Sequence, residues 1–444
     1  MTTVRASWPP EGSLSRSFSP CRAWAACSAA AMRIPRHVYK LMRRSRRAAA
    51  LARIIALGLG ASQLTACIAA FPRDSVPQQF ASAAEPPGYQ HDIRLWGDSY
   101  ASYPADRLVR FHDERLKASK ADPSINIREL NALTLSGGGS SGAFGAGILA
   151  GWAKAGTMPK FDIVTGISAG ALIAPFAFLG PAYDGVLKDG FTEVSAANIY
   201  TKHSFLGALS SGSFTSNEPL AKMLDEHITD DMLAKIAGEY AKGRRLFIGT
   251  TNLDADRAVI WDMGAIAASG RPDRRKLFNE VILASTSIPG IFPPVNLEVT
   301  AAGRTYHEMH VDGGTANEVF LMPAGLTFGK LDKTFHTKVK ARLYVIRNGR
   351  TTPEYSTVKA TLPDIAEKSV SSLIKTQAIG DLYRLYAVAE RDRIDFNYTD
   401  IPADFTVEAK SPFDNRFMRA LYAKGYEMGR DGVPWKKTPP GFLR

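Results

Sequence analysis

The fold is decided by the stretch LTLSGGGSSGAFGAGIL (133–149), which runs from an apolar strand through three glycines into a small-residue helix. Backbone N–H groups gathered at the start of such a helix bind negative charge. Three kinds of negative charge fit this turn: nucleotide phosphates, the pyrophosphate of a dinucleotide, and an oxyanion that forms only during a reaction. The residues around the turn distinguish between them.

The two nucleotide alternatives lack a required residue. A phosphate loop needs Lys and then Ser or Thr after its last glycine, whereas Gly142 is followed by Ala and Phe. The spacing of Gly137, Gly139 and Gly142 matches a dinucleotide-binding turn, which also needs an acid at the end of the second strand. Asp162 stands instead at the beginning of that strand, FDIVTG (161–166), which weakens the dinucleotide alternative.

The second strand ends in Gly166-Ile-Ser168-Ala-Gly170. A G-x-S-x-G sequence between a strand and a helix is typical of a nucleophile elbow, in which the glycines allow a sharp turn that exposes the serine. The expected βαβ unit has parallel strands, so Ser168 and the glycine turn should meet at one edge of the sheet. Backbone donors beside an exposed serine can stabilise a tetrahedral oxyanion. This pattern favours the third alternative, an oxyanion that forms only during a reaction.

Four motifs, in this order, resemble those of patatin-like phospholipases: the turn at 137–142, the elbow at Ser168, ASTSIPGIFPPV (284–295), and Asp312 with the glycines after it. The resemblance covers roughly residues 130–320. It implies a three-layer α/β/α fold with a mostly parallel central sheet, hydrolysis of lipid or phospholipid esters, and no cofactor. The residues it implies are the nucleophile Ser168, the base Asp312, the oxyanion-hole residues Gly137, Gly138 and Gly139, the elbow glycines Gly166 and Gly170, and the motif glycines Gly142, Gly313 and Gly314.

One position departs from the family pattern. Many members carry Arg or Lys just before the last glycine of the first motif, where this chain has Ser141. The departure leaves open how a phosphate head group, or the loop itself, is held.

A serine needs a neighbouring base, and two arrangements could provide one. If Asp312 acts alone, it should be partly desolvated beside Ser168, with its proton affinity raised. A triad with His336, the only histidine after Asp312, is the alternative. A metal site at His307, His310 and Asp312 is not favoured, because strand alternation turns His307 to the opposite face.

The positive charge of the chain is concentrated at its N-terminus. The net charge is +12, but residues 1–66 hold eleven Lys and Arg and a single acid, so the remainder is nearly neutral and no nucleic-acid partner is expected. A basic run at 42–47 precedes the apolar stretch 54–66, which is the pattern of a secretory signal. With Met32 or Met42 as the start, this signal would have an ordinary length.

The signal ends in Leu-Thr-Ala-Cys67, which resembles the lipobox of bacterial lipoproteins. We therefore expect cleavage before Cys67, lipidation of its sulfur, and a cell-envelope protein held at a membrane surface. Ile68 favours the outer membrane, because Asp at this position is the usual inner-membrane retention signal in lipoproteins of this kind. An uncleaved membrane anchor is the alternative. With Cys67 acylated, the folded part has no free thiol.

The predicted organisation has three parts: a basic extension and signal sequence (1–66), a flexible Pro/Ala/Ser-rich tether (67–89), and one α/β hydrolase domain (90–444). Within that domain the apolar positions of a helix at 363–392 are expected in the core. A lipid- or partner-binding lipoprotein without catalysis, on the same scaffold, is the rival function.

Overall fold

The structure is a computed structural model, and it describes residues 73–89, 93–98, 105–202, 215–321, 339–353 and 355–442. All of these residues belong to one compact unit, Cys67–Arg444. The predicted signal sequence, the lipidation site Cys67 and the alternative triad residue His336 lie outside the described residues. None of the helices in the described part is both long and apolar enough to span a membrane.

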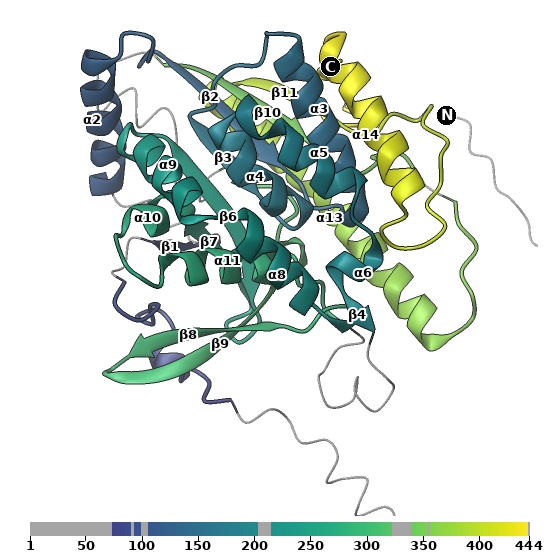
Figure 1. Ribbon diagram of the computed structural model, residues 1–444, viewed down its shortest axis with the longest axis horizontal. Coiled ribbons are helices and arrows are strands. Elements are labelled where there is room, and N and C mark those ends of the chain that lie inside the picture. The colour runs from purple at the N-terminus through teal and green to yellow at the C-terminus, as the bar shows by residue number, and fades with distance from the viewer. Residues whose placement is uncertain are drawn as a thin grey trace, which may run out of the picture. The chain divides into compact units, whose positions relative to one another are not determined.

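A nine-stranded sheet forms the centre of this unit (Figure 1). The strand order is β1-β7-β6-β3-β2-β10-β11, and the hairpin β8–β9 extends from β6. The five strands β6, β3, β2, β10 and β11 are parallel, whereas β1, β7, β8 and β9 pair antiparallel. The strands are β1 (Arg94–Trp96), β2 (Glu129–Leu135), β3 (Ile163–Gly166), β6 (Arg245–Asn252), β7 (Arg257–Asp262), β8 (Val295–Ala301), β9 (Arg304–Asp312), β10 (Lys340–Ile346) and β11 (Asp395–Thr399), with a separate pair β4 (Thr201–Lys202) and β5 (Thr215–Ser216).

Helices cover both faces of the sheet, as alternation along β2 illustrates. Leu133 and Leu135 join the larger apolar core, whereas Leu130 and Ala132 join a second core on the other face. Helices α2 and α13 cover the second face, and the others contribute to the larger core. The helices are α2 (Ala105–Ala121), α3 (Gly142–Lys154), α4 (Ala169–Leu179), α5 (Asp184–Thr192), α6 (Ala196–Ile199), α8 (Glu218–His227), α9 (Asp230–Ala241), α10 (Met263–Ala268), α11 (Arg274–Ser285), α13 (Leu362–Asp392) and α14 (Asn415–Arg430). The predicted three-layer α/β/α fold is confirmed.

The predicted flexible tether is wrong for its second part, residues 73–89. Ala84 is fully buried in a small core with Val299 and Tyr306 of the β8–β9 hairpin. Glu85 exchanges two backbone hydrogen bonds with Thr300. Proline, alanine and serine suggested a linker, but the segment pairs with the hairpin and so satisfies its backbone groups.

The expectation that the apolar positions of α13 lie in the core holds only for its C-terminal half. Leu382 and Leu385 are buried, whereas Ile365, Val370 and Leu373 are exposed, Leu373 by 70%. A helix of 31 residues is about 46 Å long, about twice the length of a seven-residue strand. The N-terminal half therefore extends beyond the sheet.

Helices α3 and α14 pack through glycines at unusually close range. A Cβ on Gly425 of α14 would lie 2.4 Å from the carbonyl oxygen of Phe144 in α3, and one on Gly147 would lie 2.2 Å from the carbonyl oxygen of Tyr422. Only glycine allows two backbones to approach in this way. The contact fixes α3, and with it the glycine turn that precedes the helix.

We therefore expect Gly425→Ala to destabilise the protein by about 1–3 kcal/mol, because the helices must separate. Helix propensity alone would make the alanine variant more stable than wild type, by about 1 kcal/mol. Gly238→Ala in α9, where an added Cβ would meet nothing within 4 Å, is the control. Urea unfolding of both variants measures the difference, and equal stabilities would contradict the close-contact interpretation.

Candidate active site

The glycine turn after β2 leaves two backbone donors without acceptors. Gly138 has a φ of 153° and Gly139 a φ of 55° before the 3₁₀ turn Gly139–Ser141 leads into α3. Among the described residues, the N–H groups of Gly138 and Gly139 have no intramolecular acceptor. The turn therefore has the donors that an oxyanion hole requires.

Asn348, the second residue after β10, holds this turn in place. Its backbone N–H donates to Ser136 Oγ (2.8 Å), and its Nδ2 donates to the Ser136 carbonyl oxygen (2.8 Å). Its Oδ1 accepts from the Gly145 N–H (2.9 Å), and a Cβ on Gly138 would lie 2.0 Å from the Asn348 carbonyl oxygen. Many family members carry Arg or Lys where this chain has Ser141, which left open how the loop is held. These contacts give part of the answer, because Asn348 binds the loop. Nothing in the local sequence singled out Asn348.

Ser168 lies on a sharp turn between β3 and α4, as the elbow motif predicts. Its φ of 53° is rare for a residue other than glycine, and its side chain is 5% exposed. The Ser168 N–H donates to Ser285 Oγ (3.1 Å). A Cβ on Gly170 would lie 2.3 Å from the Leu135 carbonyl oxygen, so the helix starts against the end of β2. This strained backbone places the hydroxyl beside the glycine turn.

Asp312, the last residue of β9, lies beside Ser168. Its N–H donates to the Ser287 carbonyl oxygen (2.9 Å), and its Oδ1 accepts from the Gly314 N–H (2.7 Å). Burial raises the pKa of Asp312 to about 7, although the Ser168 side chain and the Gly314 N–H both lower it. A buried carboxylate with a raised proton affinity is suited to accept the hydroxyl proton. Ser285 and Ser287, in the third motif, thus hold the backbones of Ser168 and Asp312.

A second buried carboxyl group, which the sequence did not indicate, adjoins this pair. Glu318 follows the DGG turn and is 5% exposed. Burial raises the pKa of Glu318 to about 8, and the nearby Asp312 raises it further, whereas Arg347 lowers it. The Gly137 backbone N–H acts in the opposite direction to burial and lowers the pKa of Glu318. Of the three predicted oxyanion-hole glycines, Gly137 therefore lies against this carboxyl group, whose Oε2 would be 2.9 Å from an added Cβ.

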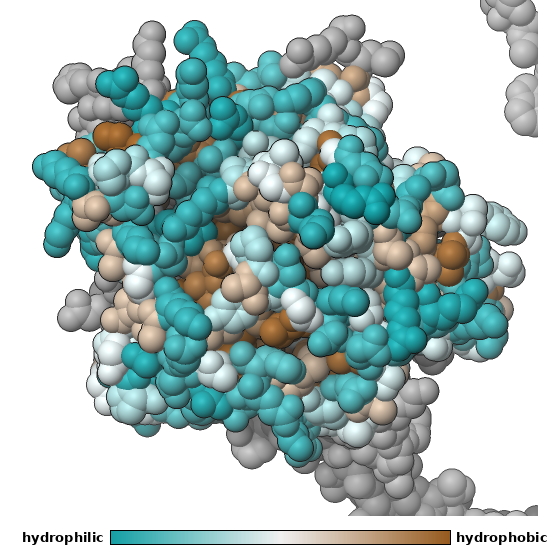
Figure 2. Space-filling model, turned by 45° about the horizontal axis from the view of Figure 1, so that its top comes forward, coloured by the Kyte–Doolittle hydropathy of each residue, from teal (hydrophilic) through white to brown (hydrophobic). Residues whose placement is uncertain are grey.

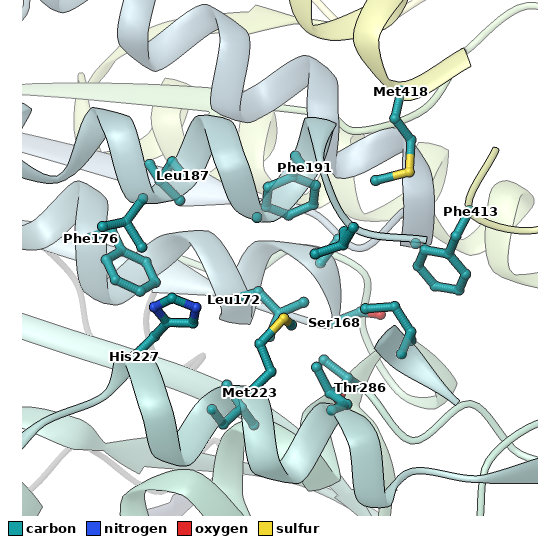
Figure 3. Close-up of a pocket in the computed structure, with 18 of the residues that line it drawn as sticks. Ser168, Leu172, Phe176, Leu187, Phe191, Met223, His227, Thr286, Phe413 and Met418 are labelled. Carbon is teal, nitrogen blue, oxygen red and sulfur yellow. The ribbon is translucent and has the colours of Figure 1, made fainter. Parts of the chain in front are cut away.

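An apolar pocket opens beside Ser168 (Figure 3). Its empty space, counted with the opening to solvent, is about 890 Å³. In Figure 3 Ser168 and Thr286 lie toward one end, and Phe176 and His227 lie toward the other. Phe176 comes eight residues after Ser168, which corresponds to about 12 Å along α4. Other lining residues are Leu172, Leu187, Phe191, Met223, Ile288, Phe292, Phe413 and Met418.

The face of the molecule drawn in Figure 2 is mostly hydrophilic, with apolar residues in small groups between polar areas. His227, expected at the surface, is exposed and also contributes to the pocket wall. His203, with the same expectation, lies outside the described residues.

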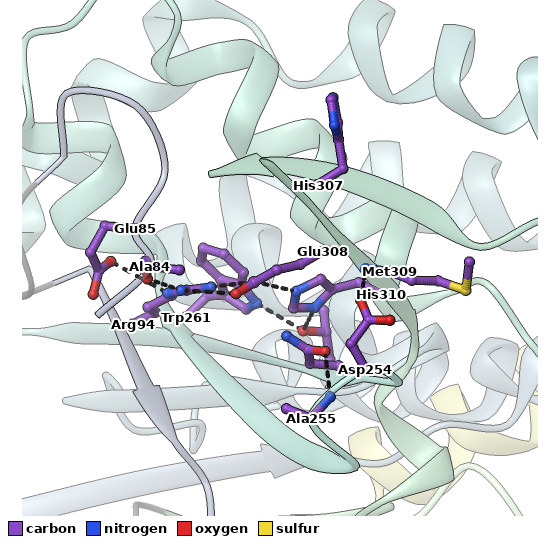
Figure 4. A network of polar contacts seen from close by, with 12 residues as sticks. Ala84, Glu85, Arg94, Asp254, Ala255, Trp261, His307, Glu308, Met309 and His310 are labelled. Carbon is purple, nitrogen blue, oxygen red and sulfur yellow. Dashed lines mark hydrogen bonds and ion pairs between the residues drawn. The ribbon is translucent and has the colours of Figure 1, made fainter. Parts of the chain in front are cut away.

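His310 belongs to a buried network of polar side chains in the sheet (Figure 4). Its Nε2 lies 3.1 Å from Glu308, which pairs with Arg94 at 2.6 Å. Its Nδ1 lies 2.9 Å from Thr250 Oγ1, which also accepts from Trp261 Nε1. Burial lowers the pKa of His310, whereas the neighbouring Glu308 raises it.

This network links strands β1, β6, β7 and β9 just before Asp312, and Figure 4 shows His307 apart from it. In the described part of the chain, no three His, Cys, Asp or Glu side chains form a possible metal site.

Residues 133–324 match the family model of patatin-like phospholipases, so the chain contains a patatin-like phospholipase domain. This match supports lipid hydrolase activity. Among solved structures, the chain is similar to VipD from Legionella pneumophila, with 12% identity, a TM-score of 0.34, and coverage of 68% of this chain and 67% of VipD.

It is also similar to human GIVD cytosolic phospholipase A2, with 11% identity, a TM-score of 0.32, and coverage of 76% of this chain and 64% of the human protein. The chain thus spans less than two thirds of the human protein. A comparison with curated protein sequences found no match.

Proposed function

We propose that this protein is a serine acyl hydrolase that cleaves carboxylic esters of lipids with a Ser168–Asp312 dyad. The observation that carries the proposal is the juxtaposition of three features: Ser168 on a strained elbow, a buried Asp312 of raised pKa, and two backbone donors without acceptors. In the first step Asp312 takes the hydroxyl proton while Ser168 Oγ attacks the ester carbonyl. The N–H groups of Gly138 and Gly139 then stabilise the tetrahedral oxyanion.

The acyl-enzyme and its release follow from the same residues. Collapse of the oxyanion breaks the ester bond, and the alcohol leaves with the proton held by Asp312. A water molecule, deprotonated by Asp312, then attacks the acyl-enzyme. Collapse of this second oxyanion breaks the bond to Ser168 Oγ, which takes the proton back from Asp312, and the fatty acid is released. The apolar pocket beside Ser168 is suited to hold the acyl chain during both steps.

The test uses the purified full chain, a fluorophosphonate probe and phospholipid vesicles, with the products analysed by mass spectrometry. We expect covalent labelling of the protein and release of free fatty acid. The same pocket would suit a non-catalytic lipid-binding protein. Vesicle binding with neither labelling nor fatty-acid release would favour that second function and contradict the first.

The acyl assignment of the pocket predicts a change in chain-length preference. Met223 lines the pocket from α8, between Ser168 and the far end (Figure 3). In Met223→Trp the indole should fill the middle of the pocket, so that kcat/KM for p-nitrophenyl octanoate falls at least about tenfold relative to p-nitrophenyl butyrate. Lys222→Trp places the same ring on the exposed side of α8 and should leave the ratio unchanged. An unaltered ratio in Met223→Trp would place the acyl chain elsewhere.

A further inference from the structure

Glu318 is a buried, titratable group in direct contact with the candidate site, and the dyad does not use it. A Cβ on Gly137 would lie 2.9 Å from Glu318 Oε2 and 3.1 Å from Ser168 Cβ, so Glu318 and Ser168 are both immediate neighbours of Gly137. A Cβ on Gly314 would lie 2.3 Å from Glu318 Oε1 and 3.0 Å from Asp312 Oδ1. The carboxyl group therefore lies between the glycine turn and the DGG turn.

The long helix α13 fixes the position of Glu318. Asp381 Oδ2 accepts from the Glu318 N–H (2.8 Å), and its Oδ1 pairs with Arg384 (3.0 Å). The charged groups that act on Glu318 come from three elements: Asp312 at the end of β9, Arg347 after β10, and Asp381 on α13. Two carboxylates and one guanidinium thus surround this carboxyl group. Its ionisation would place a further negative charge in a site that already holds Asp312.

We propose that Glu318 is a positioning residue that must be protonated for the reaction: its neutral carboxyl group holds the Gly137 end of the turn beside Ser168, and its ionisation opposes the oxyanion. The inference rests on the proposed hydrolase function. As the oxyanion forms, Asp312 takes the hydroxyl proton, so the negative charge moves from Asp312 to the glycine turn. An ionised Glu318 about 6 Å from that charge, at an effective dielectric constant of about 20, would slow this step by at most about 100-fold. A neutral carboxyl oxygen can still accept from the Gly137 N–H, so loss of the proton changes the charge and leaves the geometry similar.

A bell-shaped pH dependence follows. Asp312 must lose its proton to act as the base, and Glu318 must keep its proton. Since the pKa of Asp312 is raised to about 7 and that of Glu318 to about 8, the rate should rise through the first value and fall above the second. A single ionisation changes the rate by about tenfold per pH unit beyond its pKa.

The test is the pH profile of kcat/KM for p-nitrophenyl butyrate in wild type and Glu318→Gln. The amide has the shape of the neutral carboxyl group and cannot ionise, so we expect the decline above about pH 8 to disappear while the rise through about pH 7 remains. Glu298→Gln, at an exposed position of β8, should keep the wild-type profile. A Glu318→Gln enzyme that retains the alkaline decline would overturn the inference, whereas an equal loss at every pH would indicate a purely structural role and also overturn it.

A second variant covers the case in which Glu318→Gln fails to fold. Asp381 raises the pKa of Glu318, so Asp381→Asn should move the alkaline decline to lower pH. An alkaline limb that does not move in Asp381→Asn would contradict the inference. Fluorophosphonate labelling of wild type, which reports an activated Ser168 whatever the shape of the alkaline limb, separates a failure of this inference from a failure of the hydrolase proposal.

Discussion

Ser168→Ala is expected to reduce ester hydrolysis by a factor of about 10⁴ or more, because the variant lacks the hydroxyl that forms the acyl-enzyme in the proposed mechanism. Fluorophosphonate labelling should disappear with the activity. The stability of the variant should be nearly that of wild type, because alanine lacks only the hydroxyl and keeps the same strained backbone, whose φ is 53°. Fatty-acid release from phospholipid vesicles and the labelled fraction are the two measurements.

A control variant makes this result specific. Ser140→Ala changes a serine of the glycine turn outside the elbow and should keep both labelling and activity. Labelling that survives Ser168→Ala would place the nucleophile elsewhere and reject the dyad. Loss of activity in both variants would indicate damage to the turn instead of loss of the nucleophile.

Asp312→Asn is expected to lower kcat/KM by a factor of about 10³–10⁴, because the amide cannot accept the proton of Ser168. Asn Oδ1 can still accept from the Gly314 N–H, so the turn after β9 should persist. The rise of the wild-type rate through about pH 7 should be absent from the residual activity.

His336→Ala should retain full activity if Asp312 acts alone, whereas a comparable loss would favour the Ser168–Asp312–His336 triad.

Asp312→Asn should also stabilise the folded protein at neutral and alkaline pH. The pKa of Asp312 is about 7 in the folded state and near its ordinary value of 3.8 in the unfolded chain. Both states are protonated well below pH 4, so Asp312 then contributes no penalty. Between these two values the unfolded chain loses the proton first, and the free energy of unfolding falls as pH rises.

Above pH 7 the cost of keeping Asp312 ionised and buried lowers the free energy of unfolding by a few kcal/mol. Asp312→Asn does not have this cost. Urea unfolding at pH 4 and pH 8 should therefore show a larger gain for the variant at the higher pH. Equal gains at both values would mean that the carboxyl group of Asp312 is not destabilised by burial.

Local patterns in the sequence determined the positions of the chemistry. A glycine turn and an elbow, each between an apolar strand and a helix, have to meet at one edge of a parallel sheet because the βαβ connection leaves little freedom. The β6–β7 and β8–β9 pairs could likewise be predicted from apolar strands on either side of short turns. The short strands β1 and β11 cannot be predicted in this way, because three to five residues carry too little periodicity.

The tertiary structure alone decided which distant groups surround these motifs. Asn348, Glu318 and Asp381 come from three separate elements, and no spacing in the sequence relates them to Ser168. The raised pKa of Asp312 depends on its burial, and the segments that bury it are distant from Asp312 in the sequence. Whether an apolar residue of α13 is buried or exposed depends on where the sheet ends beneath the helix. The sequence by itself thus determined the nucleophile and its local geometry, and only the folded chain determined the electrostatic environment in which it acts.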